Sequence, residues 1–404
     1  MSRIEPRTLK GFRDYSASEQ AARQAMFAKI QTVFEQFGFS PLSTPALEYK
    51  EILMGKYGDD EKLIYSFQDN GGRDVAMRYD LTVPLARYIA ENQGSLVWPF
   101  KRYQIAPVWR ADNPQKGRLR EFYQCDVDVV GTDSVLADAE VIACAAKALE
   151  ALGLTNYKIR INDRSTLGVF SVEEIRIIDK VEKIGVQSSI LAMEQNGVDT
   201  EKIEFAKQLF SGSKKAVPDR LTQVMNALGQ FQLKGTVEFD PTIARGLDYY
   251  SGTVFEMILP EKPEYGSICG GGRYDGLVDQ FSATSMPAVG ASIGIDRLYG
   301  ALDELGLLPK IGSASVLVLN IDATLQDEYL ALVSELRSNG ISAELFYEAV
   351  KLDKQLKYAE RKGISWAVIF GSDEQANGQI KLKNLATREQ IEVSREDLID
   401  RLKK

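Results

Sequence analysis

The sequence predicts an α+β protein: a mainly antiparallel sheet domain with a helical insertion, followed by a small α/β domain. Apolar and polar residues alternate over 101–131 and again from 236, whereas helical spacing dominates between them. After residue 314 the order becomes strand, helix, strand, helix, strand. We therefore expect the sheet domain to comprise residues 1–164 and 235–307, the helical insertion residues 165–234, and the last domain residues 314–404.

The first expected element is an amphipathic helix over residues 18–37. Ser16 and Glu19 have the spacing of a capping box, and Gly38 is placed to end the helix. The next segment, residues 39–45, contains two prolines and therefore fits a long strand at a sheet edge or an interface. The expected apolar face of the helix consists of Phe27, Ile30, Phe34 and Phe37.

The centre of the sheet domain is expected to be a long hairpin within residues 101–131, with a loop over 111–117. The later elements follow from the same periodicities. In the sheet domain they are a helix over 138–153, strands over 157–162, 252–259 and 288–294, and a helix over 296–305. In the last domain, strands over 315–320, 341–346 and 366–370 alternate with helices over 325–336 and 352–362, which predicts a mainly parallel sheet.

The composition excludes several kinds of chemistry. The 404 residues include no histidine, so imidazole acid–base catalysis, Ser-His nucleophiles and imidazole metal ligands are excluded. The net charge is 49 − 57 = −8, so any phosphate site must be a local cluster of cations. Cys125, Cys144 and Cys269 are far apart, which indicates core thiols in a reducing compartment. The N-terminal segment and the lack of a long apolar run favour the cytosol and no membrane partner.

One face of the strand that ends near residue 131 is unusually polar. Side chains alternate between the two faces of a strand, so Gln124, Asp126 and Asp128 lie on one face and apolar residues lie on the other. A hairpin with one face in water and a ligand-binding face would both show this alternation. The neighbouring strand ends at Arg110, next to a loop that contains further cations. Cations beside a polar sheet face suit a ligand with a phosphate at one end and a cationic group at the other.

Three further segments each leave two interpretations open. Arg245 precedes a glycine and the tyrosine pair 249–250. The segment is either a surface turn or a buried site in which the arginine is paired with an acidic partner. The glycines at 270–272 allow a close approach of a ligand, but a flexible loop has the same composition. Gly290 and Gly294 lie in the strand that precedes Arg297, which is expected at the start of a helix. These glycines allow either close packing of the strand or the binding of a flat ligand against it.

Together these segments resemble the histidyl-tRNA synthetase family of class II aminoacyl-tRNA synthetases. The segments around Arg110 and over 294–297 resemble the second and third class II motifs, and residues 38–45 resemble the first. The family's two signature segments are matched by residues 245–250 and 271–276, and residues 9–15 and 78–84 also fit. In the last domain, residues 355–359 and 377–383 resemble the family's anticodon-binding domain.

The resemblance implies an ATP-dependent ligase that activates L-histidine to histidyl-adenylate and transfers it to the 3′ end of tRNA-His. It implies ATP with Mg²⁺ but no zinc, haem or flavin, and a homodimer held partly through the strand near Pro45. We assign no protein ligand to the magnesium ion. The implied site residues are Arg110, Arg245 and Arg297 for catalysis; Arg110, Asp112 and Arg297 for ATP; Asp80, Thr82, Gln124, Asp128, Tyr249, Tyr250 and Tyr274 for histidine; and Gln115, Lys116 and Arg118 for tRNA.

A second interpretation is the catalytically inactive, synthetase-like regulatory subunit of ATP phosphoribosyltransferase, which shares the catalytic fold. That protein typically lacks the C-terminal domain and has degenerate signature segments. This chain keeps both features, so we expect the ligase.

Overall fold

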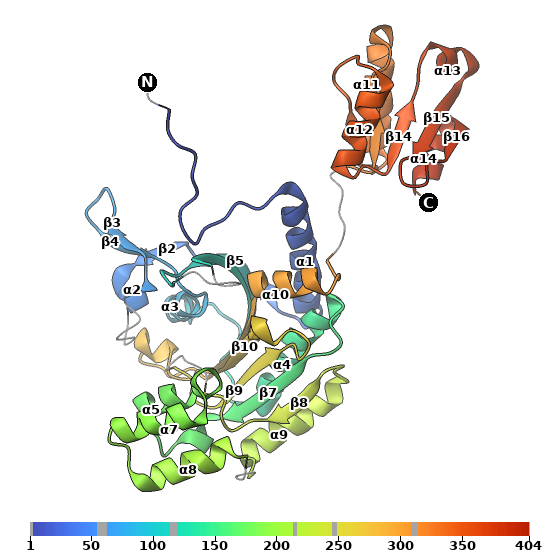
Figure 1. Cartoon of the computed structure of the whole chain (residues 1–404). Coiled ribbons are helices and arrows are strands. Elements are labelled where there is room, and N and C mark those ends of the chain that lie inside the picture. The colour runs from blue at the N-terminus through green and yellow to red at the C-terminus, as the bar shows by residue number, and fades with distance from the viewer. Residues whose placement is uncertain are drawn as a thin grey trace. The chain divides into compact units, whose positions relative to one another are not determined.

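The computed structural model describes residues 3–54, 63–113, 119–212, 216–244, 249–308 and 314–403. The chain separates into two compact units (Figure 1). One unit is built from residues 25–308 together with residues 1–14, and the other from residues 309–404 together with residues 15–24. None of the described helices combines the length and the apolar character that a membrane span requires.

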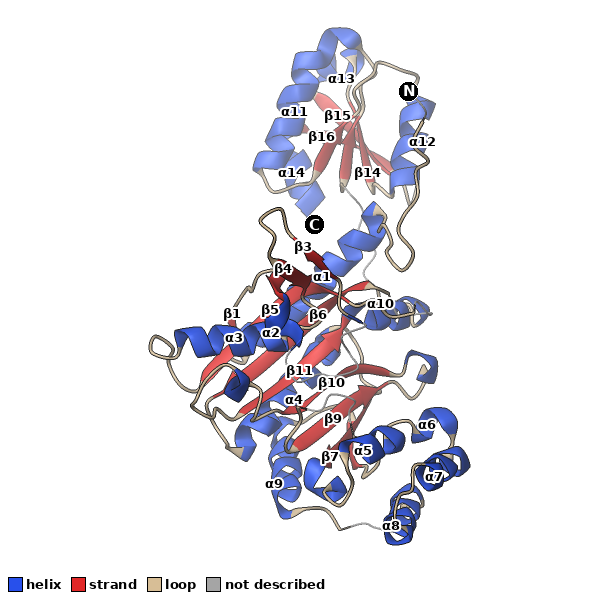
Figure 2. Ribbon diagram, turned by 90° about the vertical axis from the view of Figure 1, so that its left-hand side faces the viewer, coloured by secondary structure: helices blue, strands red, loops and turns tan. Residues whose placement is uncertain are grey.

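A large sheet organises the first unit, with the strand order β1-β5-β6-β11-β10-β9-β7-β8 among the described residues (Figure 2). Every neighbouring pair is antiparallel except β1 with β5 and β7 with β8, which confirms the expected sheet type. Its strands are β1 Ser40–Pro41, β5 Phe100–Trp109, β6 Glu121–Val130, β7 Lys158–Asp163, β8 Thr236–Phe239, β9 Thr253–Ile258, β10 Ser267–Arg273 and β11 Ala288–Gly294.

The expected hairpin is the pair β5 and β6, which runs from Phe100 opposite Val130 to Trp109 opposite Glu121. The edge strand is much shorter than expected, because only Ser40 and Pro41 pair with β5. A proline has no N–H to donate, and the last ladder-like bond runs from Leu42 N to Tyr103 O at 2.9 Å. The prediction of an edge position was right and that of a long strand was wrong.

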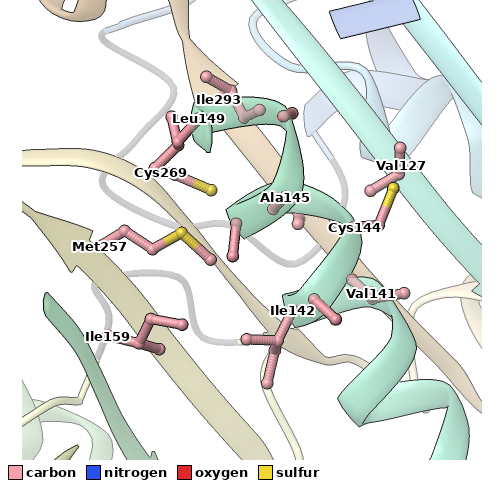
Figure 3. Close-up of a cluster of buried hydrophobic side chains, with 14 of the residues drawn as sticks. Val127, Val141, Ile142, Cys144, Ala145, Leu149, Ile159, Met257, Cys269 and Ile293 are labelled. Carbon is pink, nitrogen blue, oxygen red and sulfur yellow. The ribbon is translucent and has the colours of Figure 1, made fainter. Parts of the chain in front are cut away.

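Helices cover one face of this sheet: α1 Ala17–Gln36, α4 Val135–Ala151, α9 Asp219–Leu228 and α10 Ile295–Glu304. The capping box of α1 is present, with Ser16 N donating to Glu19 Oε2 at 2.8 Å, and α4 begins earlier than expected because Ser134 caps it. The three cysteines are buried and unbridged, as expected. Figure 3 shows α4 packed on the strands through Val127, Val141, Ile142, Cys144, Ala145, Leu149, Ile159, Met257, Cys269 and Ile293.

The helical insertion has two parts. α5 Val172–Ile178, α7 Val186–Gln195 and α8 Thr200–Phe210 share a small core of their own and gather in one group (Figure 1). α9 instead contributes Leu221, Val224 and Leu228 to the main core beside α4. The short α6 Val181–Ile184 links α5 to α7 and ends at Gly185, whose φ is +84°.

A smaller sheet lies at the start of the first unit, in the order β2-β4-β3 among the described residues. The helix that follows this sheet, α3 Thr82–Asn92, contributes Val83, Leu85 and Ile89 to a second core. The elements are β2 Leu47–Tyr49, α2 Lys50–Met54, β3 Ser66–Gln68, β4 Asp74–Met77 and α3 Thr82–Asn92.

The second unit is α/β, but its sheet is not mainly parallel. In the order β13-β12-β14-β15-β16, the first two pairs are parallel and the last two antiparallel. The six-residue helix α13 is too short to carry the chain back for a parallel strand, so β15 returns antiparallel to β14. The elements are β12 Val316–Val318, α11 Gln326–Ser338, β13 Ala343–Leu345, α12 Leu352–Lys362, β14 Trp366–Ile369, α13 Ser372–Asn377, β15 Gln379–Asn384, β16 Gln390–Ser394 and α14 Arg395–Lys403.

The glycine run at 270–272 belongs to the central strand β10, so the flexible-loop interpretation is wrong. A Cβ atom on Gly271 would stand 2.0 Å from Gly290 O in the adjacent strand β11. Glycine therefore lets the two backbones approach more closely than a side chain would allow.

We predict that Gly271→Ala destabilises the protein by about 3 kcal/mol or more, because a backbone oxygen cannot move aside as a side chain can. Gly276→Ala is the matched control, since a Cβ there meets no atom within 4 Å. Urea unfolding followed by circular dichroism measures both variants. Equal midpoints would contradict the prediction.

Candidate active site

A cavity of about 540 Å³ opens on the face of the large sheet opposite the main core. All the described residues that we assigned to the site line this one cavity: Asp80, Thr82, Arg110, Asp112, Gln124, Asp128, Tyr249, Tyr250, Tyr274 and Arg297. Arg245, Gln115, Lys116 and Arg118 lie outside the described residues. The lining also includes Asp126, which the sequence analysis placed on the polar strand face without assigning it a ligand, and Asp179, Ser292 and Asp296, to which it assigned none.

The polar face of β6 forms the floor of the cavity. Asp126 and Asp128 are each only 2% exposed and Gln124 is 8% exposed, so the interpretation of a hairpin face in water is wrong. Gln124 Nε2 donates to Ser292 Oγ of β11 at 2.6 Å. The alternation alone did not distinguish the two interpretations, because burial of the polar face depends on strands that are distant in sequence.

Asp128 is held by groups from three sides. Arg102 lies directly opposite on β5 and places Nη2 2.8 Å from Asp128 Oδ2. Tyr274, which follows β10, donates its hydroxyl proton to Asp128 Oδ1. A Cβ on Gly290 would stand 2.0 Å from the same Oδ1 atom, so the glycine leaves room for the carboxylate. Burial raises the pKa of Asp128, while the charge of Arg102 and the bond from Tyr274 oppose this rise.

Two other carboxyl groups share this buried region. Burial raises the pKa of Asp80 to about 6, although Val83 N, in the first turn of α3, donates to Asp80 Oδ1 at 3.1 Å. Burial also raises the pKa of Asp126 to about 7; Arg102 lowers it and the negative charge of Asp128 raises it further. The floor therefore holds three carboxyl groups in a setting that penalises their full ionisation.

The other end of the cavity carries two guanidinium groups. Arg110 follows β5, donates from Nε to Tyr79 O at 2.8 Å and lies over the Phe122 ring. Arg297 lies in the first turn of α10 and donates from Nη1 to Ser267 O at 3.0 Å. A backbone carbonyl accepts a hydrogen bond from each side chain, and both guanidinium groups line the cavity wall.

Strand register sets the order of these groups along the cavity. Gly294, just before α10, pairs with Gln124, whereas Gly290 pairs with Asp128. The two arginines are thus near the Gln124 end, and Asp128 lies four residues further along β6, about 13 Å away along the strand. Two arginines therefore lie at one end of the cavity and the buried Asp128 at the other, with Asp80 within electrostatic range of Arg110.

Aromatic rings form a wall near the carboxyl end. The Tyr249 ring lies 4.9 Å from that of Tyr250 and 5.8 Å from that of Tyr274, measured between centroids. At the opposite end, Arg120 Nε donates to Asp112 O at 2.9 Å and thereby fixes the start of the loop after β5. Within the described ranges, no group of three or more Cys, Asp or Glu side chains has a metal-binding arrangement.

Comparisons with known proteins agree with these features. A family model described as histidyl-tRNA synthetase matches residues 11–172 and 171–298, and one described as anticodon binding domain matches residues 314–404. Histidine–tRNA ligases of Rhodopirellula baltica and Wolinella succinogenes are each 42% identical to this chain, covering 97% and 95% of it and 96% and 94% of their own lengths.

Solved structures show the same likeness. The crystal structure of histidyl-tRNA synthetase from Nostoc sp. PCC 7120 is 33% identical, with a TM-score of 0.87 and 99% coverage of both chains. A Bacillus halodurans structure titled as an ATP phosphoribosyltransferase regulatory subunit/histidyl-tRNA synthetase is 22% identical, with a TM-score of 0.73 and coverage of 88% of this chain and 97% of that one. At that identity the likeness extends to the fold alone.

Proposed function

The chain belongs to the histidyl-tRNA synthetase family and acts as a histidine–tRNA ligase, and we propose that it activates histidine with ATP in the cavity over the large sheet. The histidyl group then passes to tRNA-His, which the C-terminal domain helps to bind. The observation that carries this proposal is the polarity of the cavity, with arginines at one end and buried carboxyl groups at the other.

Arg110 and Arg297 would bind the triphosphate and Asp112 would lie near the adenosine. In the activation step the carboxylate of histidine attacks the α-phosphorus of ATP, the bond to the bridging oxygen breaks and pyrophosphate leaves. Two anions must approach each other, and charge gathers on the phosphoryl oxygens. Guanidinium groups that are already held by Tyr79 O and Ser267 O stabilise this charge without reorganising. Arg245 would add a third positive charge, as the family resemblance implies.

The floor of the cavity would hold the histidine, with its ring at the carboxyl end and its ammonium group nearer the arginines. Asp80, Thr82 and Gln124 would bind its ammonium group. Asp128 would accept a hydrogen bond from the imidazole ring, with Tyr250, Tyr274 and Tyr249 around the ring. A ligand that cannot satisfy these buried polar groups leaves them unpaired, and this penalty discriminates against other amino acids.

The remaining assignments rest on the family resemblance. Gln115, Lys116 and Arg118 would contact the acceptor end of the tRNA. Magnesium would arrive with ATP as part of the substrate, and we name no protein ligand for it. A class II enzyme that acts on tRNA-His during protein synthesis fits a cytoplasmic location.

We also infer a homodimer. β1 is an edge strand, and the chain continues from it into the small sheet, where Leu47, Tyr49 and Phe67 are 45%, 52% and 49% exposed. Exposed apolar side chains beside an open strand edge favour association with a second copy.

The dimer prediction is tested by analytical ultracentrifugation at micromolar concentration. We expect a dimer for the wild type and a monomer for Leu47→Glu/Tyr49→Glu, because the new charges would be buried without partners. Leu330→Glu changes another exposed leucine and is expected to leave the dimer intact. A monomeric wild type would refute the inference.

The proposed activity is tested by ATP–pyrophosphate exchange with each of the 20 amino acids in turn. We expect exchange with histidine alone, followed by histidine-dependent charging of tRNA-His. A folded protein without exchange would favour the regulatory-subunit interpretation, and exchange with another amino acid would refute the assigned specificity.

We predict that Gly290→Ala raises the KM for histidine at least about tenfold in this assay while the KM for ATP stays unchanged. The added Cβ would stand 2.0 Å from Asp128 Oδ1 and would displace the carboxylate from its place beside Arg102. Gly94→Ala is the control, because a Cβ there meets nothing within 4 Å. An unchanged KM for histidine would argue against the role of Asp128.

A further inference from the structure

The floor of the cavity contains more acidic groups than the buried cations beside them can neutralise. Asp80, Asp126 and Asp128 are at most 3% exposed. The fully buried Arg102 is in ion-pair contact with Asp128. Arg110 acts on Asp80 and Arg78 acts on Asp126 through their charges, but among the described residues neither carboxylate has a cation in ion-pair contact. Ionising all three carboxyl groups would therefore leave two buried charges without a direct partner, which is costly.

Several acceptor atoms on this floor have no hydrogen-bond partner in the part of the chain that the structure describes. They are Asp80 Oδ2, Gln124 Oε1 and Asp126 Oδ1, and all three residues line the cavity. Such unpaired acceptors suit a ligand that brings several N–H donors and a positive charge, as an ammonium group does.

Asp126 occupies the middle of the floor. On β6 it lies two residues from Gln124 and two from Asp128, on the same face, so about 7 Å separates it from each along the strand. Its neighbours across the sheet are Gln104 of β5 and Ser292 of β11. Asp126 therefore lies between the proposed ammonium site and the proposed imidazole site.

The charged and titratable groups that act on Asp126 come from every neighbouring element. Arg102 of β5 lowers its pKa, whereas Asp128 of β6 and Asp80, just before α3, raise it. Arg78, which follows β4, is also within electrostatic range of Asp126, and its guanidinium donates to Thr44 O and Pro107 O. Tyr274 bonds to Asp128, so its hydroxyl proton is already committed.

We propose that Asp126 is a further specificity residue of the histidine site: without histidine the three carboxyl groups share a proton, held chiefly by Asp126, and the ammonium group of histidine displaces that proton to solvent. This inference rests on the proposed function. The positive charge of the ligand replaces the positive charge of the proton, so the buried charge stays balanced. A ligand without a cationic amino group cannot make this exchange.

The sign of the pH dependence follows from this exchange. Because the pKa of Asp126 in the free protein is about 7, binding that requires its ionised form releases a proton, and histidine affinity rises with pH toward 8. The stability of the free protein changes in the opposite sense. Between about pH 4 and pH 7 the folded state holds more protons than the unfolded state, so stability falls as pH rises through this window.

The test is titration calorimetry of L-histidine binding at pH 7 in two buffers, phosphate and Tris. The two buffers have different ionisation enthalpies, so the difference between the two observed binding enthalpies gives the number of protons released. We expect Asp126→Asn to release about half a proton fewer than the wild type and to bind histidine about tenfold more weakly. Protons from histidine itself are common to both proteins and cancel. Asp303→Asn, an exposed carboxylate in α10, is expected to behave as the wild type. Equal proton release by Asp126→Asn and wild type overturns the proposal.

A second measurement needs no variant. Histidine-induced difference infrared spectra of the wild type at pH 7 should show the loss of a protonated-carboxyl band, and its persistence overturns the proposal. The two hypotheses fail in different ways. A wild type that binds histidine and supports exchange without displacing a proton refutes only the inference, whereas one that does not bind histidine refutes the proposed function.

Discussion

The ion pair between Arg102 and Asp128 is the interaction on which the rest of the site depends. It joins two neighbouring strands at directly opposite positions and is buried from water. Such a pair contributes little net stability, but removing one partner would leave a bare buried charge and cost about 3–5 kcal/mol. Asp128 is therefore fixed in place before any ligand arrives, with Tyr274 as its second partner.

Close backbone packing makes this arrangement possible. Gly290 leaves space for the Asp128 carboxylate, and Gly271 allows β10 to approach β11. The end of β10 is held from the core face of the sheet. Arg273, which is 2% exposed, forms an ion pair there with the buried Asp138 of α4. This buried pair holds the strand end that presents Tyr274, so the polar site is supported by the core helix beneath the sheet.

The site separates charge along one strand. The arginine end can meet the phosphates of ATP, and the carboxyl end can meet the cationic and donor groups of histidine. The two ends lie on the same face of β6. ATP and histidine can therefore bind side by side along this face, with the α-phosphorus and the carboxylate next to each other between the two ends.

The sequence by itself determined the elements with strong local periodicity, including the β5–β6 hairpin, α4, α10 and the alternating elements of the second unit. It also indicated, through motif resemblance, which described side chains would share a cavity. Only the tertiary structure decided that the polar face of β6 is buried, that Gly271 belongs to a strand, and that Asp126 lies between Gln104 and Ser292 on the buried floor. These features depend on the pairing of β11 with β6 and with β10. More than a hundred residues of sequence separate β6 from β10 and β11. Local pattern fixes which way a side chain points on its own strand, whereas contacts between distant strands fix what it faces.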